Sequence, residues 1–208
     1  MKIGMPLVAA LLLAVALAGC GTEREAPLPP GSAVLVIGDS ITNGYGVDPA
    51  AAWPALLAER TGWRVTAVGV NGDRASGGRA RLPALLDDEV PALVIIELGG
   101  NDLLQRVPAA ETVADLDAMI EAARSKGARV ALMAAPQPTA VGVVAGLTAA
   151  GFYRDLAQKR NVTLIGKALP AVLSDRSLLQ DPVHPNAAGH RALAERARDE
   201  LAAAGLLR

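Results

Sequence analysis

The most constraining feature of this sequence is an apolar segment that runs directly into a polar one, Ala33-Val34-Leu35-Val36-Ile37 followed by Gly38-Asp39-Ser40. An unbroken apolar run of this length, rich in β-branched residues, is typical of a strand buried on both faces. Such strands belong to parallel sheets, which bind ligands beyond the carboxyl ends of their strands. Ser40 follows that end of the first strand, so its hydroxyl is expected to point into a cleft.

Strand and helix patterns alternate along the rest of the chain. This alternation predicts an α/β fold, a three-layer α/β/α sandwich with a mostly parallel five-stranded sheet. Strands are expected at 33–37, 64–70, 92–98, 129–134 and 162–165. Helices are expected at 48–60, 76–88, 108–126, 146–160 and 187–204, with an irregular loop at 136–146. The 208 residues suit one domain, predicted to span 33–208, and no internal repeat is visible.

The N-terminal residues are not expected to belong to this domain. A short basic start precedes an apolar run, and residues 1–19 have the character of a signal segment. Leu17-Ala18-Gly19-Cys20 resembles a bacterial lipobox, whose cysteine is acylated; an ordinary cleaved signal with an incidental cysteine is the alternative. Cys20 is the only cysteine, so an internal disulfide is excluded. Residues 20–32 contain several prolines and are expected to form a tether.

The lipobox resemblance also implies a location. Gly21 follows the cysteine, where an aspartate would favour retention in the inner membrane. We therefore expect a lipid-anchored protein of the cell envelope, held by acylated Cys20 in the outer membrane and facing the periplasm. The formal net charge of −1 and the 2% aromatic content argue against a nucleic-acid partner.

Four loops carry polar residues of the kinds that perform chemistry. They are Gly38-Asp39-Ser40-Ile41-Thr42-Asn43-Gly44, Val70-Asn71-Gly72-Asp73-Arg74, Glu97-Leu98-Gly99-Gly100-Asn101-Asp102 and Asp181-Pro182-Val183-His184-Pro185-Asn186. The first three follow predicted strands, and the fourth precedes the last predicted helix. Taken singly, each loop is compatible with an ordinary turn or helix cap. It is their combination that indicates a site.

The combination supplies the parts that acyl transfer needs, namely a nucleophile, a base, an acid that orients the base, and donors to the developing oxyanion. Ser40 is the candidate nucleophile, and His184 is the candidate base. Asp181, three residues before His184, is the candidate orienting acid. Gly72, with an unobstructed backbone N–H, and Asn101, with a side-chain amide, are the candidate oxyanion donors.

These four blocks resemble those of the SGNH hydrolases, also called GDSL esterases and lipases. The Ser, Gly, Asn and His of that name match Ser40, Gly72, Asn101 and His184, while Ile41 stands at the leucine position of GDSL. Segments 52–57, 80–86 and 97–102 are similar to the bacterial periplasmic thioesterase/lysophospholipase and arylesterase subgroup. The resemblance implies the family's flavodoxin-like fold and adds the backbone N–H of Ser40 to the oxyanion hole.

The sequence therefore predicts a serine esterase that hydrolyses carboxylic esters or thioesters, such as short-chain acyl esters and lysophospholipids, through an acyl-enzyme on Ser40. Two alternatives stay open at this point. One is a carbohydrate O-acetylesterase of the cell envelope, and the other is a lipid-anchored binding protein without catalysis. No cofactor is expected, and no metal, because no His/Cys cluster with zinc-type spacing is present.

Overall fold

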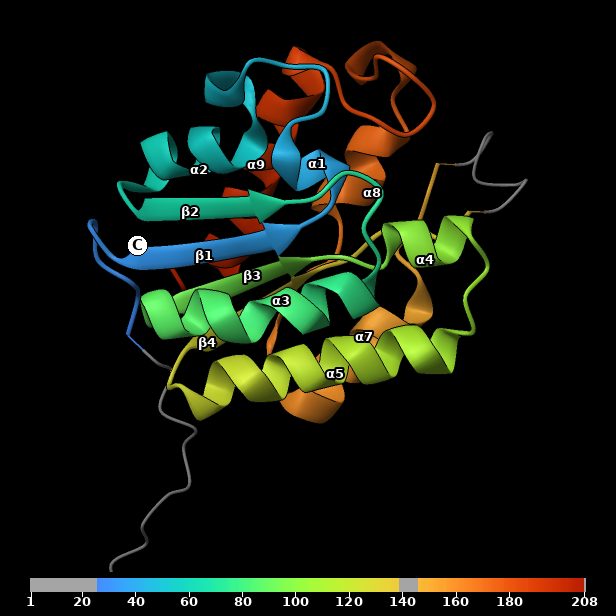
Figure 1. The fold of residues 1–208 in the computed structure, drawn as a ribbon. Helices are drawn as coiled ribbons and strands as arrows, with labels where there is room; N and C mark the ends of the chain where they lie inside the picture. Colours follow the sequence, from blue (N-terminus) through green and yellow to red (C-terminus); the bar gives the residue numbers. More distant parts are fainter. Residues whose placement is uncertain (1–25, 139–145, 208) are drawn as a thin grey trace, which may run out of the picture.

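A five-stranded sheet forms the centre of the molecule (Figure 1). The computed structural model of the chain describes residues 26–138 and 146–207. The strands are β1 (Ala33–Gly38), β2 (Arg64–Gly69), β3 (Leu93–Glu97), β4 (Arg129–Met133) and β5 (Thr163–Ile165). They lie in the order β2-β1-β3-β4-β5, and every neighbouring pair is parallel. The predicted parallel α/β sandwich is thus confirmed.

Helices cover both faces of the sheet, which makes three layers (Figure 1). The helices are α1 (Ser40–Asn43), α2 (Trp53–Thr61), α3 (Ala75–Asp88), α4 (Gly100–Leu104), α5 (Ala109–Ser125), α7 (Gly151–Arg160), α8 (Ala168–Leu173) and α9 (Ala187–Ala203), with short 3₁₀ helices η1 (Pro49–Ala51) and η2 (Arg176–Leu178). Helices α3, α5 and α7 pack on one face, and α2, α8 and α9 pack on the other. In the described part of the chain, no helix is both long enough and apolar enough to cross a bilayer.

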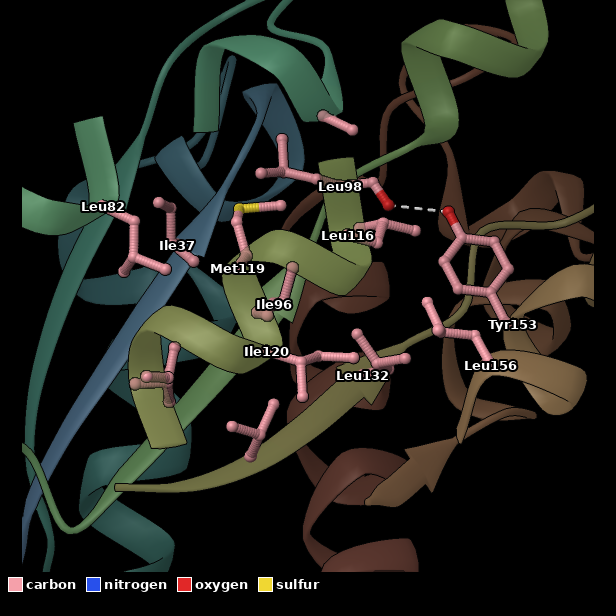
Figure 2. Packing of buried hydrophobic residues seen from close by; sticks show 14 of the residues in the cluster. Ile37, Leu82, Ile96, Leu98, Leu116, Met119, Ile120, Leu132, Tyr153 and Leu156 are labelled. Carbon is pink, nitrogen blue, oxygen red and sulfur yellow. Dashed lines mark hydrogen bonds between the residues drawn. The ribbon is translucent and has the colours of Figure 1, made fainter. Parts of the chain in front are cut away.

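The alternation of side chains along the buried strands fills two separate cores. Ile37 and Ile96 point to the α3/α5/α7 side, where Figure 2 shows them beside Leu82 and Met119. Val36 and Ile95, their chain neighbours, point to the α2/α8/α9 side. Both faces of β1 and β3 are buried. The apolar run at 33–37 therefore contains no polar residue, because none of its side chains faces solvent.

Several helix boundaries differ from those expected. The helix expected over 48–60 is split, because Ala52 adopts an extended conformation between η1 and α2. The helix expected from residue 146 begins only at Gly151. Helix α8 was not expected at all, since its six residues are too few to display a helical period.

Residues 26–32, expected as the end of the tether, lie against the domain. The Leu28 N–H donates to the Leu206 carbonyl (2.9 Å), and the Trp63 indole donates to the Leu28 carbonyl. Leu28 is partly buried against the α2/α8/α9 core, and this apolar contact stabilises the segment's position on the domain. The predicted signal segment 1–19, Cys20 and the first part of the tether lie outside the described residues, as do residues 139–145 of the predicted loop.

Candidate active site

Ser40 lies at the junction between the central strand and the first helix. It is the first residue of α1, and the side chain of Asp39 caps that helix by accepting the N–H of Ile41 (2.9 Å). Gly44, in a left-handed conformation at φ +71°, ends the helix after four residues. The short helix therefore holds the Ser40 hydroxyl at the carboxyl edge of the sheet, where the sequence predicted a cleft.

His184 and Asp181 come from the loop before α9. The Asp181 Oδ1 atom accepts the N–H groups of Val183 and His184, each at 2.9 Å, which is the local turn that an aspartate favours. The other oxygen, Oδ2, lies 2.7 Å from His184 Nδ1. His184 Nε2 lies 3.0 Å from Ser40 Oγ. The structure thus joins three residues from the two ends of the chain in one hydrogen-bonded row.

The charge state of Asp181 follows from its contacts. Partial burial raises its pKa, but the hydrogen bonds from the backbone of Val183 and from His184 outweigh this and leave the pKa below its ordinary value. The ionised carboxylate can only accept, so the proton of the imidazole sits on Nδ1. This tautomer leaves Nε2 free to accept the hydroxyl proton of Ser40.

Gly72 and Asn101 line the same cavity as Ser40. Gly72 has φ +75° in the turn after β2, a conformation that side chains other than glycine rarely adopt. The Asn101 amide nitrogen donates to Asp39 Oδ2 (3.0 Å) and to the Asp73 carbonyl (2.9 Å). These two acceptors determine where the Asn101 amide lies without a substrate, and donation to an oxyanion would replace one of them.

The cavity above these residues has a volume of about 960 Å³. Many of its walls are apolar, with the side chains Ile41, Leu104, Leu147, Leu169, Leu173 and Leu179. The ring of Tyr45 lies over the His184 imidazole, with the ring centroids 4.6 Å apart. Within the described residues, no group of three or more His, Cys, Asp or Glu side chains is arranged to hold a metal ion.

Two buried acids beside Ser40 were not assigned a role by the sequence. They are Asp39, which directly follows β1, and Glu97, the last residue of β3. In the structure Glu97 Oε2 accepts the Thr42 hydroxyl (2.8 Å), and both carboxyl groups are almost completely buried. The available signal was an acid at the end of an otherwise apolar strand, since a buried carboxyl group requires hydrogen-bond partners.

The model of the GDSL-like Lipase/Acylhydrolase family matches residues 36–192. The Esterase TesA of Pseudomonas aeruginosa is 37% identical over 168 residues, which cover 78% of this chain and 84% of that protein. The Thioesterase 1/protease 1/lysophospholipase L1 of Escherichia coli is 33% identical over 156 residues, covering 74% of this chain and 75% of that protein. A crystal structure of TesA superposes with a TM-score of 0.75 at 34% identity, covering 83% of this chain and 99% of that one.

Proposed function

The chain belongs to the GDSL-like lipase/acylhydrolase family and is a carboxylic ester hydrolase, and we propose that it works through a covalent acyl-enzyme on Ser40. In this mechanism His184 removes the hydroxyl proton as Ser40 Oγ attacks the carbonyl carbon of an ester or thioester. The protonated imidazole then gives this proton to the departing alcohol or thiol. Water, activated by His184, releases the acid and restores Ser40.

The observation that carries this proposal is the continuous row of hydrogen bonds through His184. Nε2 lies 3.0 Å from Ser40 Oγ, within reach for proton transfer, and Nδ1 lies 2.7 Å from Asp181 Oδ2. Asp181 holds the imidazole in the required tautomer and stabilises its positive charge during the reaction.

The proposed oxyanion hole consists of the backbone N–H groups of Ser40 and Gly72 and the side-chain amide of Asn101. Its support is that all three residues line one cavity. Losing one donor of this kind costs roughly 2.7–4 kcal/mol of transition-state stabilisation in comparable sites.

For the substrate, we propose acyl esters and thioesters, from short-chain acyl esters to lysophospholipids. The apolar walls of the cavity suit an acyl chain, and a relative bears the name thioesterase 1/protease 1/lysophospholipase L1. Neither a carbohydrate O-acetylesterase nor a binding protein without catalysis is favoured by the names of the curated relatives. A series of p-nitrophenyl and CoA esters of increasing chain length tests the proposal, and turnover restricted to acetyl esters would contradict it.

The replacement Ser40→Ala tests the nucleophile. We expect a loss of at least 1,000-fold in kcat for p-nitrophenyl butyrate, since removing a triad serine can cost about 10⁶-fold. A fluorophosphonate probe should label the wild-type chain on Ser40 and leave the variant unlabelled. Wild-type turnover by a pure Ser40→Ala sample would remove Ser40 from this role.

We also propose that acylated Cys20 anchors the mature protein in the outer membrane, facing the periplasm. The support is the lipobox-like Leu17-Ala18-Gly19-Cys20 and the glycine that follows it. Several acyl chains on one residue would hold the protein firmly, at about 0.8 kcal/mol for each buried methylene group. Mass spectrometry should find a mature chain that begins at an acylated cysteine, and Cys20→Ser should release the protein from the membrane fraction. An unmodified mature N-terminus would contradict the anchor.

A further inference from the structure

The turn after β2 carries Gly72, one of the proposed oxyanion donors, and little packs against its tip. Apart from its chain neighbours, no described atom would lie within 4 Å of a methyl group added at Gly72. The Asp73 N–H donates to the Val70 carbonyl at 3.1 Å, which closes the turn on itself. Since side-chain packing does not hold the tip, its position relative to Ser40 depends on polar contacts.

Arg81 of α3 joins this turn to the end of β1. Its Nη1 atom donates to Asp73 Oδ2, and its Nη2 atom donates to the Gly38 carbonyl at 2.8 Å. The Gly38 carbonyl also accepts the N–H of Val70, where the turn begins, at 3.2 Å. Gly77 leaves room for the ion pair, because a methyl group there would collide with Asp73 Oδ1. The exposed fraction is 21% for the Arg81 side chain and 15% for Asp73, so both partners are largely shielded from water.

The ion pair reaches residues that the proposed reaction needs. Asp73 directly follows Gly72, and its backbone carbonyl accepts the Asn101 amide at 2.9 Å. The carbonyl that binds the other arm of the guanidinium lies two residues before Ser40. Arg81 therefore links the turn that carries one oxyanion donor, and contacts a second, to the strand that carries the nucleophile.

We propose that Arg81 is a positioning residue for the oxyanion hole. Its guanidinium holds the Asp73 carboxylate and the Gly38 carbonyl at once, and so sets where the Gly72 N–H lies relative to Ser40. A planar group with donors in fixed directions suits this task, since two contacts with two segments define both distance and orientation. This inference rests on the proposed function, because it concerns the oxyanion hole of that reaction.

The position of Arg81 determines which kinetic constant it should affect. Neither Arg81 nor Asp73 lines the cavity, so neither is expected to contact the substrate. A displaced turn would weaken hydrogen bonds that matter most in the transition state, when negative charge has developed on the carbonyl oxygen. Loss of the ion pair should therefore lower kcat and leave KM nearly unchanged.

The variant Arg81→Met keeps most of the length of the side chain without its donors. We expect kcat for p-nitrophenyl butyrate to fall about 10–100-fold, less than the full loss of a donor can cost, with KM within about threefold. The matched control is Arg79→Met on the same helix. Arg79 donates to Asp115 at 2.9 Å but is 58% exposed, so kcat should stay within about twofold. Each kcat is measured per site labelled to completion by a fluorophosphonate, so that unfolded protein is not counted.

A second variant breaks the same contact from the other side. Asp73→Ala keeps the backbone carbonyl that accepts Asn101 and should lower kcat by a similar factor, which tests the inference even if Arg81→Met does not fold. The double variant should have no lower kcat than either single variant, because one contact is lost in all three. Losses that multiply would mean that the two residues act separately. Recovery of kcat in the double variant would mean that Arg81 only neutralises Asp73, and either result would overturn the inference.

Inhibition by phenylboronic acid adds a readout that a purely structural role would not affect. The boron becomes a tetrahedral anion when Ser40 Oγ binds to it, so the affinity depends on the oxyanion donors. Arg81→Met should weaken this inhibition by about the factor lost in kcat/KM, and Arg79→Met should not change it. An unchanged affinity, or a kcat of Arg81→Met within twofold of wild type, would overturn the inference. If the proposed function itself fails, the wild-type chain will not be labelled on Ser40, whatever the Arg81 variants do.

Discussion

At the scale of single residues, His190 is a neutral histidine buried in the protein interior. Its side chain is fully buried between α9 and α2, and Nδ1 accepts the N–H of Trp53 at 3.2 Å. Within the described residues, Nε2 has no hydrogen-bond partner. Burial, together with the charge of nearby His184, lowers the pKa of His190 to about 4. The imidazole is thus held without charge under conditions where an unfolded chain would protonate it.

This burial makes the stability of the protein depend on pH. The unfolded chain takes up a proton near pH 6.5, whereas the folded chain does so only near pH 4, so the free energy of unfolding falls as the pH drops between these values. The difference amounts to about 3 kcal/mol. His190→Asn keeps an acceptor for Trp53 but cannot be protonated. In urea unfolding at a series of pH values, the advantage of wild type over this variant should shrink by about that amount from pH 7 to pH 4. A constant difference would contradict the prediction.

Asp181 offers a second test at this scale. In Asp181→Asn the carbonyl oxygen can still accept the N–H groups of Val183 and His184, but the amide group facing Nδ1 donates. The imidazole then carries its proton on Nε2 and cannot accept the proton of Ser40. We expect kcat to fall by about 10³–10⁴-fold.

The matched control for this variant is Asp175→Asn. Asp175 accepts the N–H of Ser177 in a similar turn, but it does not line the cavity. This change should leave kcat within about twofold of wild type. Similar losses in the two variants would mean that Asp181 acts only through its turn.

The sequence predicted Ser40, Asp181 and His184 because the polar loops in combination supply a nucleophile, a base and an orienting acid, and the structure brings these residues together. It did not predict how the Asn101 amide is held. That depends on Asp39 and on the Asp73 carbonyl, which lie 62 and 28 positions away along the chain. The partner of Glu97 was missed for the same reason, since Thr42 is 55 positions away and belongs to another element. Contacts between residues this far apart leave no mark in local composition or periodicity.

At the scale of elements, α7 supports the turn that leads into α4, the helix that carries Asn101. The hydroxyl of Tyr153 donates to the Leu98 carbonyl at 2.6 Å, and both residues are buried (Figure 2). Directly after Leu98, Gly99 has φ +105°, and a side chain there would collide with the Tyr153 hydroxyl. The bond therefore holds the start of the turn that leads to Asn101.

Removing this hydroxyl should cost stability and some activity. Tyr153→Phe leaves the Leu98 carbonyl buried without its partner, so we expect the free energy of unfolding to fall by about 1–3 kcal/mol. We also expect a lower kcat, because the turn that positions Asn101 at the start of α4 becomes less well defined. Urea unfolding and p-nitrophenyl butyrate turnover measure the two effects. Phe152→Leu, which removes the ring stacked on Tyr153 but keeps the hydroxyl, is the control for changed packing. Unchanged stability of Tyr153→Phe would contradict the prediction.

Element by element, the strands were more predictable than the helices. All five strands are found where the sequence predicted them. In β1, β3 and β4 burial on both faces leaves an uninterrupted apolar signal, whereas no residue of the edge strand β2 is buried. Helices that cover one face of the sheet tolerate breaks. Ala52 interrupts the helix expected over 48–60, and the backbone of 146–150 precedes α7 rather than beginning it. Such breaks depend on how the loop packs, which a single sequence does not display.

At the scale of the whole molecule, the site and the N-terminal segment lie at opposite ends of the strands. Ser40 and the cavity lie at the carboxyl ends of the strands, and residues 26–32 lie at their amino ends (Figure 1). There Arg64 and Arg129, each the first residue of its strand, donate to the carbonyls of Gly31 and Ala26. In the proposed lipoprotein, only residues 21–25 separate Cys20 from this end of the strands, a reach of about 20 Å. The cavity would then open away from the anchoring membrane.

This separation predicts that the N-terminal segment contributes to stability and not to catalysis. A chain that begins at Ala33 loses the Leu28 side chain from the α2/α8/α9 core and the hydrogen bond to Leu206, unlike a chain that begins at Ala26. Burial of one partly covered leucine is worth at most about 1.5–3 kcal/mol, so we expect the free energy of unfolding to fall by roughly 1–3 kcal/mol. The kcat/KM for p-nitrophenyl butyrate should stay within about twofold, because the lost contacts lie across the sheet from Ser40. Leu28→Ala in the longer chain should reproduce most of the stability loss. A shorter chain with normal stability but impaired turnover would contradict the prediction, because it would mean that residues 26–32 affect the cavity at the carboxyl ends of the strands.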